Sequence, residues 1–158
     1  MTTTDKGLVV TLLSDTEIRM TRAFNAPLHL VWEAISKPEH IKRWWGRGNP
    51  LDVTLDFRQG GAYRYVEHTP DGETHAFRGE FREIVPMERV VQTFEWEGMP
   101  GHIAVETLIL EERDGKTLLT TTTVFSSKEE RDGALNMGME AGSAQSFDAL
   151  EAVLAGMR

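Results

Sequence analysis

Cysteine is absent from this chain of 158 residues. Without cysteine the protein forms no disulfide bond, and it has no thiolate nucleophile and no cysteine-ligated zinc or iron–sulfur site. The sequence also lacks the phosphate loop and the G-x-G-x-x-G fingerprint of nucleotide-binding proteins. It lacks the G-x-S-x-G turn that presents a nucleophilic serine as well. We therefore expect no cofactor.

Long apolar segments and positive charge are also lacking. No run approaches the ~20 apolar residues of a membrane-spanning helix. The start of the chain, Met1 to Lys6, has no basic region, and the apolar run Leu8 to Leu13 is too short for the core of a signal peptide. The 17 basic and 25 acidic residues give a net charge of −8, whereas nucleic acids and anionic membranes are bound by basic surfaces. We expect a cytoplasmic protein whose partners include neither a membrane nor a nucleic acid.

Internal repeats, low-complexity tracts and linker-like stretches are absent too. A chain of this length is typical of one domain, and it can bury roughly two-thirds of its unfolded surface. The composition, 40% hydrophobic and 27% charged, is that of an ordinary globular protein. Residues 1–158 are therefore predicted to form a single domain.

The stretch from Ser127 to Gly156 is predicted to form one long C-terminal helix. Ser127 and Glu130 have the spacing of a capping box, in which each side chain satisfies a free amide at the helix start. At about 100° per residue, one face carries Leu135, Met139, Gly142, Ser143, Ser146, Phe147, Leu150, Val153 and Leu154. The residues predicted to point away from it are Ala141, Ala144, Gln145, Asp148 and Glu151.

That helix face is uneven in size. Its C-terminal half is bulky, but Gly142, Ser143 and Ser146 in its middle are too small to fill the space beneath them. Glycine inside a helix costs roughly 1 kcal/mol relative to alanine. We interpret the helix as a lid over a cavity, with Met139 as an adaptable part of the wall. The alternatives are a close approach of helix to sheet, or a kink at Gly133 or Gly138.

Before this helix, the apolar pattern predicts an antiparallel sheet. Leu51, Val53 and Leu55 alternate with polar residues, as in a half-buried strand. Short turn sequences such as Asp114-Gly115 join consecutive strands, which indicates antiparallel pairing. Two short helices follow the first strand, and the second is predicted to begin with a capping box at Ser36. The fold class is therefore α+β: six or seven strands curl around the last helix.

Several motifs along the chain are family-specific as a series. They are Phe24-Asn25-Ala26-Pro27, Pro38 to Gly46 ending in Trp44-Trp45-Gly46, Asp56 to Gly61, Glu83-Ile84-Val85-Pro86, and Phe147-Asp148-Ala149-Leu150. This series resembles the Hsp90-ATPase-activator-like family of the START and Bet v 1 superfamily, over roughly residues 16–156. Arg47 and Gln59 depart from it, at positions where the family usually has proline.

The resemblance implies the helix-grip fold. In that fold a curved antiparallel sheet grips a long C-terminal helix and leaves a hydrophobic pocket between them, in agreement with the architecture predicted from periodicity. The eukaryotic co-chaperones of the family carry an additional N-terminal domain for Hsp90 contact. We expect no such domain here, because 158 residues leave no room for it.

Strand alternation selects the candidate ligand-binding residues, since alternate residues share one face of a sheet. We predict contacts from Trp44, Tyr63, Tyr65, Phe77, Trp96, Glu106 and Met139. Neighbouring helical residues point about 100° apart, so one of Trp44 and Trp45 should be packed and the other should lie nearer the pocket mouth. Any of these aromatic residues could instead belong to the core.

Glu106 is the candidate for acid–base chemistry. In an apolar pocket its pKa would be raised by desolvation, and it could act with a tyrosine or with His102. The alternative is a solvated glutamate or an ion pair with an arginine. We assign no catalytic residue. We also predict no metal site, because the five histidines are scattered: His29, His40, His68, His75 and His102.

The function predicted from these features is binding of a small hydrophobic or aromatic molecule in the cavity between sheet and C-terminal helix. One alternative is a polyketide-cyclase-like enzyme that uses a pocket carboxylate or tyrosine. Another is an Hsp90-type chaperone accessory whose functional surface lies outside. The stretch Leu8 to Leu13 could be an exposed sheet edge that pairs with a second copy, so a homodimer is a further prediction.

Overall fold

The computed structural model describes residues 2–5, 7–46 and 48–157, so Arg47, one of the two departures from the family pattern, lies outside the described residues. The described residues form nine strands and four helices. The strands are β1 (Thr2–Asp5), β2 (Leu8–Ser14), β3 (Glu17–Phe24), β4 (Leu51–Leu55), β5 (Ala62–His68), β6 (Thr74–Val85), β7 (Arg89–Trp96), β8 (Ala104–Arg113) and β9 (Lys116–Val124). The helices are α1 (Leu28–Ser36), α2 (Pro38–Trp44), α3 (Lys128–Asn136) and α4 (Met139–Met157).

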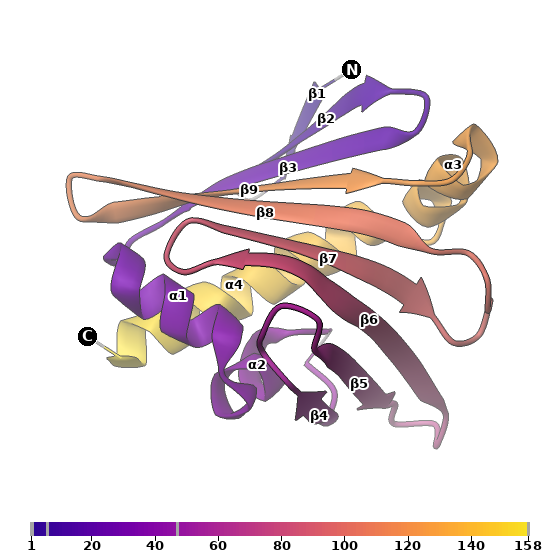
Figure 1. Ribbon diagram of the computed structural model, residues 1–158, viewed down its shortest axis with the longest axis horizontal. Helices are drawn as coiled ribbons and strands as arrows, with labels where there is room; N and C mark the ends of the chain where they lie inside the picture. Colours follow the sequence, from indigo (N-terminus) through magenta and orange to yellow (C-terminus); the bar gives the residue numbers. More distant parts are fainter. Residues whose placement is uncertain (1, 6, 47, 158) are drawn as a thin grey trace.

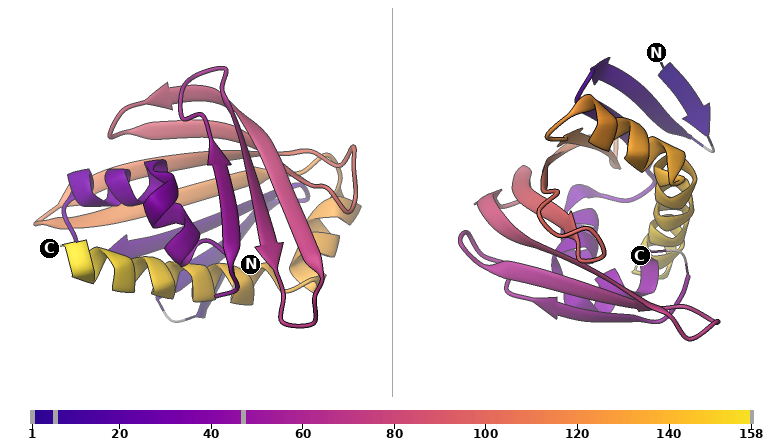
Figure 2. Two further views of the ribbon diagram at one scale, coloured as in Figure 1. Left: turned by 90° about the horizontal axis from the view of Figure 1, so that it is seen from below. Right: turned by 90° about the vertical axis from the view of Figure 1, so that its right-hand side faces the viewer.

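The strands pair antiparallel in one sheet, in the order β1-β2-β3-β9-β8-β7-β6-β5-β4. The sheet is strongly curved, and α4 runs along its concave side with α1 and α2 beside it (Figures 1 and 2). The turn between β8 and β9 has positive φ at both Asp114 and Gly115, as the hairpin sequence predicts. The predicted α+β helix-grip fold is thus confirmed.

The sheet is larger than predicted, with nine strands instead of six or seven. Two strands precede the predicted ones. One is β2, the stretch Leu8 to Leu13 that was considered as a sheet edge, and the other is β1, which was not predicted and pairs with β2 over Thr2–Asp5. Its run of three threonines carries no alternation of apolar and polar residues, so the pattern used for the other strands does not detect it. The stretch Leu8 to Leu13 is consequently not an edge, because β1 covers it on one side and β3 on the other. The two edges are β1 and β4.

The predicted single C-terminal helix is in fact two helices. Ser127 begins α3 as expected, and its hydroxyl oxygen accepts a hydrogen bond from the Glu130 amide at 3.2 Å. The helix then ends at Asn136, and Gly138 adopts a φ of 88°. This left-handed conformation is the usual end of a helix and favours glycine. The kink considered at Gly138 is therefore a complete break.

The second short helix begins differently from the prediction. Lys37 occupies its N-cap position, and no side chain caps the helix. The Ser36 hydroxyl instead donates to the Trp32 carbonyl within α1, at 2.6 Å. Proline at the first position of α2 lacks an amide that would need a partner. The capping box predicted at Ser36 is thus wrong.

The hydrophobic core consists of three clusters. The C-terminal cluster contains Phe24, Ala26, Val31, Ala34, Trp44, Leu110, Leu119, Leu150, Val153 and Leu154. The tyrosine cluster contains Ile41, Leu51, Tyr63, Tyr65, Phe81 and Val90. The N-terminal cluster contains Leu8, Val10, Ile18, Met20 and Ala144. Ala144 was expected to point away from the sheet, but β2 and β3 extend the sheet around α4 and bury this second side of the helix.

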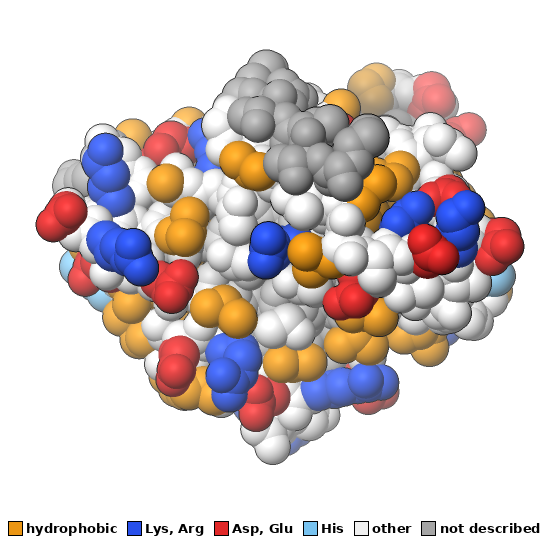
Figure 3. All heavy atoms as spheres, turned by 90° about the horizontal axis from the view of Figure 1, so that it is seen from above, with side chains coloured by type: hydrophobic (Ala, Val, Ile, Leu, Met, Phe, Trp, Pro, Cys, Tyr) orange, Lys and Arg blue, Asp and Glu red, His pale blue; other side chains and the backbone are white. Residues whose placement is uncertain are grey.

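The surface carries both signs of charge. Figure 3 shows one face, on which basic and acidic side chains are interspersed with hydrophobic ones, and the described part of this face has no extended basic surface. None of the helices in the described ranges is both long enough and apolar enough to span a membrane.

Candidate functional site

The middle of the concave sheet face is incompletely packed. Phe77 on β6, Gln92 and Phe94 on β7, Glu106 on β8 and Thr121 on β9 are each only half-buried. Together they form what we call the central concavity. At alternate positions along β8, Glu106 is followed by Leu108 and Leu110, and Leu110 belongs to the same core cluster as Leu150, Val153 and Leu154 of α4. Glu106 and its register partner Gln92 therefore lie on the face of the sheet that α4 covers. Figure 2 shows α4 running along this concave face. A side chain between a helix and a well-packed sheet is normally almost inaccessible, so the three core clusters leave these five side chains incompletely covered.

The strand register gathers these residues into rows. Gln92 pairs with Glu106, and Glu106 pairs with Thr123 on β9. On the other half of the sheet, Tyr65 pairs with Phe77, which in turn pairs with Trp96. The alternation that predicted common faces for these side chains therefore agrees with the register.

The small residues of α4 do not serve a close approach to the sheet. A Cβ atom added at Gly142 would meet nothing within 4 Å, although this glycine is half-buried. Ser146, on the following turn, donates from its hydroxyl to the backbone carbonyl of Gly46. This bond ties α4 to the segment that follows α2. The geometry at Gly142 therefore contradicts the alternative in which the small residues allow a close approach of the helix to the sheet.

Glu106 is the main polar group of the central concavity. Its Oε1 accepts a hydrogen bond from the Gln92 side-chain nitrogen at 3.1 Å. Burial raises the pKa of Glu106, and the Gln92 hydrogen bond only partly opposes this rise in pKa. Glu106 is thus half-buried, and its carboxyl group lies in a poorly solvated place. None of the described arginines forms the ion pair with Glu106 that was considered from the sequence.

The two tyrosines of β5 lie near Glu106 but have different environments. The Tyr63 hydroxyl donates to the Thr93 carbonyl at 2.5 Å. The Tyr65 hydroxyl makes no hydrogen bond to any other described residue. Its oxygen is not completely enclosed by other atoms. Burial raises the pKa of both tyrosines, and the negative charge of Glu106 adds to the rise in each pKa. Both phenols therefore stay protonated at neutral pH.

Aromatic rings extend the wall from Tyr65. The Trp45 ring lies 4.9 Å from the Tyr65 ring and 5.0 Å from the Phe77 ring, measured between centroids. Phe77 stacks on Phe94 at 5.7 Å. Trp45 was absent from the candidate residues chosen from the sequence. The sequence indicated that only one of the two adjacent tryptophans is packed in the core. It did not show whether that residue is Trp44 or Trp45.

Trp44 is the packed member of the pair. It is 9% exposed, and its indole nitrogen donates to the Ala34 carbonyl at 3.0 Å. Its ring stacks on Phe147 with centroids 6.4 Å apart. The structure therefore places Trp44 in the C-terminal cluster and not on the wall of the concavity.

Trp96 and Met139 lie at the margins of the site. The Trp96 ring folds over Gly98, where an added Cβ would come within 2.4 Å of it, and its centroid is 6.1 Å from that of His75. Met139 begins α4 and packs on the N-terminal cluster. Of the seven candidate residues, the structure brings Tyr63, Tyr65, Phe77 and Glu106 together.

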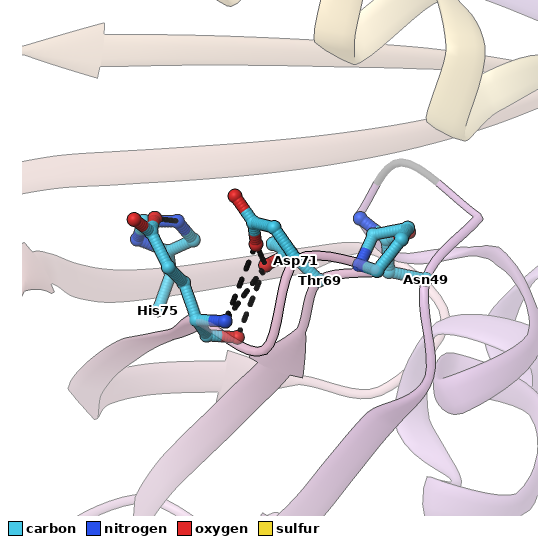
Figure 4. Close-up of a pocket in the computed structure, with 6 residues that line it drawn as sticks. Asn49, Thr69, Asp71 and His75 are labelled. Atoms are coloured by element: carbon cyan, nitrogen blue, oxygen red, sulfur yellow. Dashed lines mark hydrogen bonds and ion pairs between the residues drawn. The ribbon is translucent and has the colours of Figure 1, made fainter.

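A surface depression of about 540 Å³ lies at the end of the β5–β6 hairpin (Figure 4). Asn49 faces Thr69 and Asp71 across it, and His75 lies on its other side. Asn49 also donates to Glu67 at 3.1 Å, and this carboxylate is 2% exposed. The depression thus borders the inner face of β5, and none of its lining residues belongs to the aromatic wall.

The histidines lie outside the central concavity. His102 precedes β8, is exposed, and its Nδ1 contacts the Glu130 carboxylate on α3. His102, considered with a tyrosine as a possible partner of Glu106, thus has Glu130 as its contact in the structure. His68 contacts Asp52 at 2.7 Å on the surface. Within the described ranges, no three histidine or acidic side chains are placed to hold a metal ion.

The curved sheet around α4 defines this protein as a helix-grip domain, and solved structures share that fold. A crystal structure of a Rhodobacter sphaeroides protein has a TM-score of 0.88 and 23% identity, covering 96% of this chain and 99% of that chain. A solution structure of an Arthrobacter aurescens protein has a TM-score of 0.83 and 24% identity, covering 99% and 91%. A crystal structure of a Chromobacterium violaceum protein has a TM-score of 0.75 and 26% identity, covering 89% and 98%.

The family follows from the sequence profile of the "Activator of Hsp90 ATPase homolog 1-like protein" family, which matches residues 25–155. The chain belongs to this family. None of the curated proteins matches the chain. The resemblance inferred from the motifs is thereby confirmed.

Proposed function

We propose that the protein binds a small hydrophobic or aromatic molecule in the central concavity. The observation that carries this proposal is the set of half-buried inner side chains between α4 and the middle of the sheet. Ligand sites in proteins are typically concave and mostly apolar, with a small number of placed polar groups. Trp45, Phe77 and Phe94 supply the apolar wall here, and Glu106 and Tyr65 supply the polar groups.

The first test is native mass spectrometry of gently purified protein, which should reveal a retained small molecule. The second uses a bulky residue to fill the site. Ser143 lies one helical turn before Phe147, whose ring contacts Phe24 and Trp44 inside the molecule, so Ser143 lies on the same side of α4. Ser143→Phe should abolish binding of the uncharged fluorescent probe N-phenyl-1-naphthylamine.

The matched control for this variant is Ala141→Phe. Ala141 is exposed on the same helix, so the added ring should point into solvent and leave binding unchanged. Circular dichroism should show the native fold in both variants. Undiminished probe binding in a folded Ser143→Phe protein would contradict a site beneath α4.

An enzyme of the polyketide-cyclase type is a second candidate, because Glu106 is a desolvated carboxyl group beside two tyrosines. Rates on a panel of phenolic and polyketide-like substrates, with Glu106→Gln for comparison, test it. If Glu106→Gln turned over a substrate as fast as the wild type, Glu106 would have no chemical role.

A chaperone accessory role would use the outer surface. Exposed aliphatic side chains occur on the outer face of β8 and β9, at Ile109, Leu118 and Val124. A pull-down at micromolar protein tests association with Hsp90, and no association would argue against this role. A cytoplasmic location and a homodimer stay predictions, and the edge strands available for pairing are β1 and β4.

A further inference from the structure

Two polar groups on the wall of the central concavity have unused hydrogen-bonding capacity. Glu106 accepts from Gln92 through Oε1, and no hydrogen bond joins its Oε2 to another described residue. The Tyr65 hydroxyl likewise makes no hydrogen bond to another described residue, whereas the Tyr63 hydroxyl donates to the Thr93 carbonyl. Neither Oε2 of Glu106 nor the Tyr65 oxygen is a fully enclosed atom, so both oxygens keep some accessible surface.

We propose, resting on the proposed function, that the concavity takes an uncharged ligand with an apolar body and one hydroxyl or carbonyl oxygen, which Glu106 and Tyr65 bind. The neighbouring Trp45, Phe77 and Phe94 rings suit a flat aromatic body. A buried polar pair of this kind selects ligands strongly, because a ligand without the matching group leaves both protein groups desolvated and unpaired.

The surroundings of Glu106 disfavour an anionic ligand. The group faces Gln92 from β7 and Thr123 from β9, both neutral. From β5 it faces Tyr63 and Tyr65, which raised pKa values keep protonated. Among the described residues, no cation contributes to the pKa of Glu106, which burial raises. A ligand carboxylate here would add a second charge without a counter-ion in a poorly solvated place.

The acidic side chains of α4 also lie elsewhere. Asp148 pairs with Arg22 of β3 at 2.9 Å, and Glu151 accepts from the Asn25 amide at 3.1 Å. Glu140 is in the first turn of α4 and does not contribute to the pKa of Glu106. The protonation of Glu106 is therefore set by its burial, by the Gln92 hydrogen bond and by the ligand.

The two kinds of oxygen ligand should respond differently to pH. A protonated Glu106 donates to a ligand carbonyl, whereas an ionised Glu106 repels it. A ligand hydroxyl accepts from the protonated form and donates to the ionised form, so it is bound in both states. Affinity for a ketone should therefore fall as pH rises through the raised pKa of Glu106, by up to about tenfold per pH unit.

The experiment compares four probes with one naphthalene body: naphthalene, 1-naphthol, 1-acetonaphthone and 1-naphthoate. Isothermal titration between pH 5 and 8 should show the naphthol and the ketone binding at least about tenfold tighter than the naphthoate. The affinity for the ketone should fall with pH, and the affinity for the naphthol should not.

Two conservative variants separate recognition from folding. Glu106→Gln keeps the shape and a neutral donor, so it should remove the pH dependence of ketone binding and improve naphthoate binding. Tyr65→Phe should weaken the naphthol and the ketone and leave naphthalene unchanged. Circular dichroism checks that both variants are folded.

Binding of naphthalene with no preference among the head groups, or the same pH profile in Glu106→Gln, would overturn this inference and leave the proposed function standing. Naphthoate binding as tightly as the naphthol would also overturn it. Failure of all four probes to bind would overturn both proposals.

Discussion

The Tyr63 hydroxyl donates a hydrogen bond to the Thr93 carbonyl at 2.5 Å, although their strands β5 and β7 are not neighbours. The tyrosine ring crosses the intervening strand β6 at Gly79, its partner in the register. Thr93 completes the arrangement by accepting the Glu80 amide on its side-chain oxygen at 2.8 Å. A side chain thus replaces part of the backbone ladder between β6 and β7.

Replacement of Gly79 by alanine should destabilise the protein. The new Cβ would lie 2.0 Å from the Thr93 oxygen and 2.5 Å from a Tyr63 ring carbon, so backbone or ring must move. Such overpacking typically costs about 1–3 kcal/mol. Urea unfolding measures the free energy of unfolding. The control is Gly156→Ala, where no atom lies within 4 Å of the added Cβ. Equal stabilities of the two variants would refute the crossing.

The break between α3 and α4 predicts opposite effects for two neighbouring glycines. Gly138→Ala places a Cβ in the left-handed region, at a cost of about 1–2 kcal/mol. Gly142→Ala lies within α4 with free space around it and should stabilise by up to about 1 kcal/mol. Thermal unfolding of both variants shows whether each substitution raises or lowers stability. A stabilised Gly138→Ala would indicate one continuous helix.

Glu106→Gln should raise stability at neutral pH. Because the pKa of Glu106 is raised in the folded state, its contribution is fully present below the unfolded pKa and is lost as pH rises through the folded pKa. The loss is about 1.4 kcal/mol for each unit between the two pKa values. Urea unfolding from pH 4 to 8 should show the variant gaining on the wild type with increasing pH. A constant difference would mean that Glu106 titrates normally.

The effect of Glu106 on the pH dependence of stability is measured as the difference between wild type and Glu106→Gln. This difference is needed because other carboxyl groups, whose pKa values are lowered, change stability with pH in the opposite direction. The pKa of Glu95 is lowered, first by the Gly101 amide and then by Arg78, and the pKa of Glu97 is lowered by Arg64. Their contributions are common to wild type and variant, so they cancel.

Glu112→Ala should weaken the start of α1. Pro27 at the N-cap has no side-chain oxygen, and Glu112 Oε2 from β8 accepts the Leu28 amide at 2.7 Å instead. Loss of a capping interaction typically costs about 0.5–2 kcal/mol. The adjacent Glu111, which is exposed, supplies the control: Glu111→Ala should change stability by less than about 0.5 kcal/mol. Equal unfolding midpoints for the two variants would argue against the cap.

Local patterns predicted the elements that local physics dictates. The alternation along β5 to β9 identified the inner faces, and Asp114-Gly115 identified a hairpin, because both depend on neighbouring residues alone. The capping serine of α3 was predicted for the same reason. The prediction at Ser36 failed because its hydroxyl bonds to the Trp32 carbonyl within α1. The prediction of one continuous helix failed because Gly138 adopts the left-handed conformation, which ends a helix.

The sequence by itself determined the fold, the family and the aromatic character of one sheet face. These properties follow from the periodicity of apolar residues and from short motifs that can be read directly in the sequence. Only the tertiary structure decided that Trp45 and not Trp44 faces that wall, that His102 lies outside it, and that β1 covers the expected edge. Each outcome depends on contacts between residues far apart in the chain. Their relative positions arise only when the sheet curves around α4.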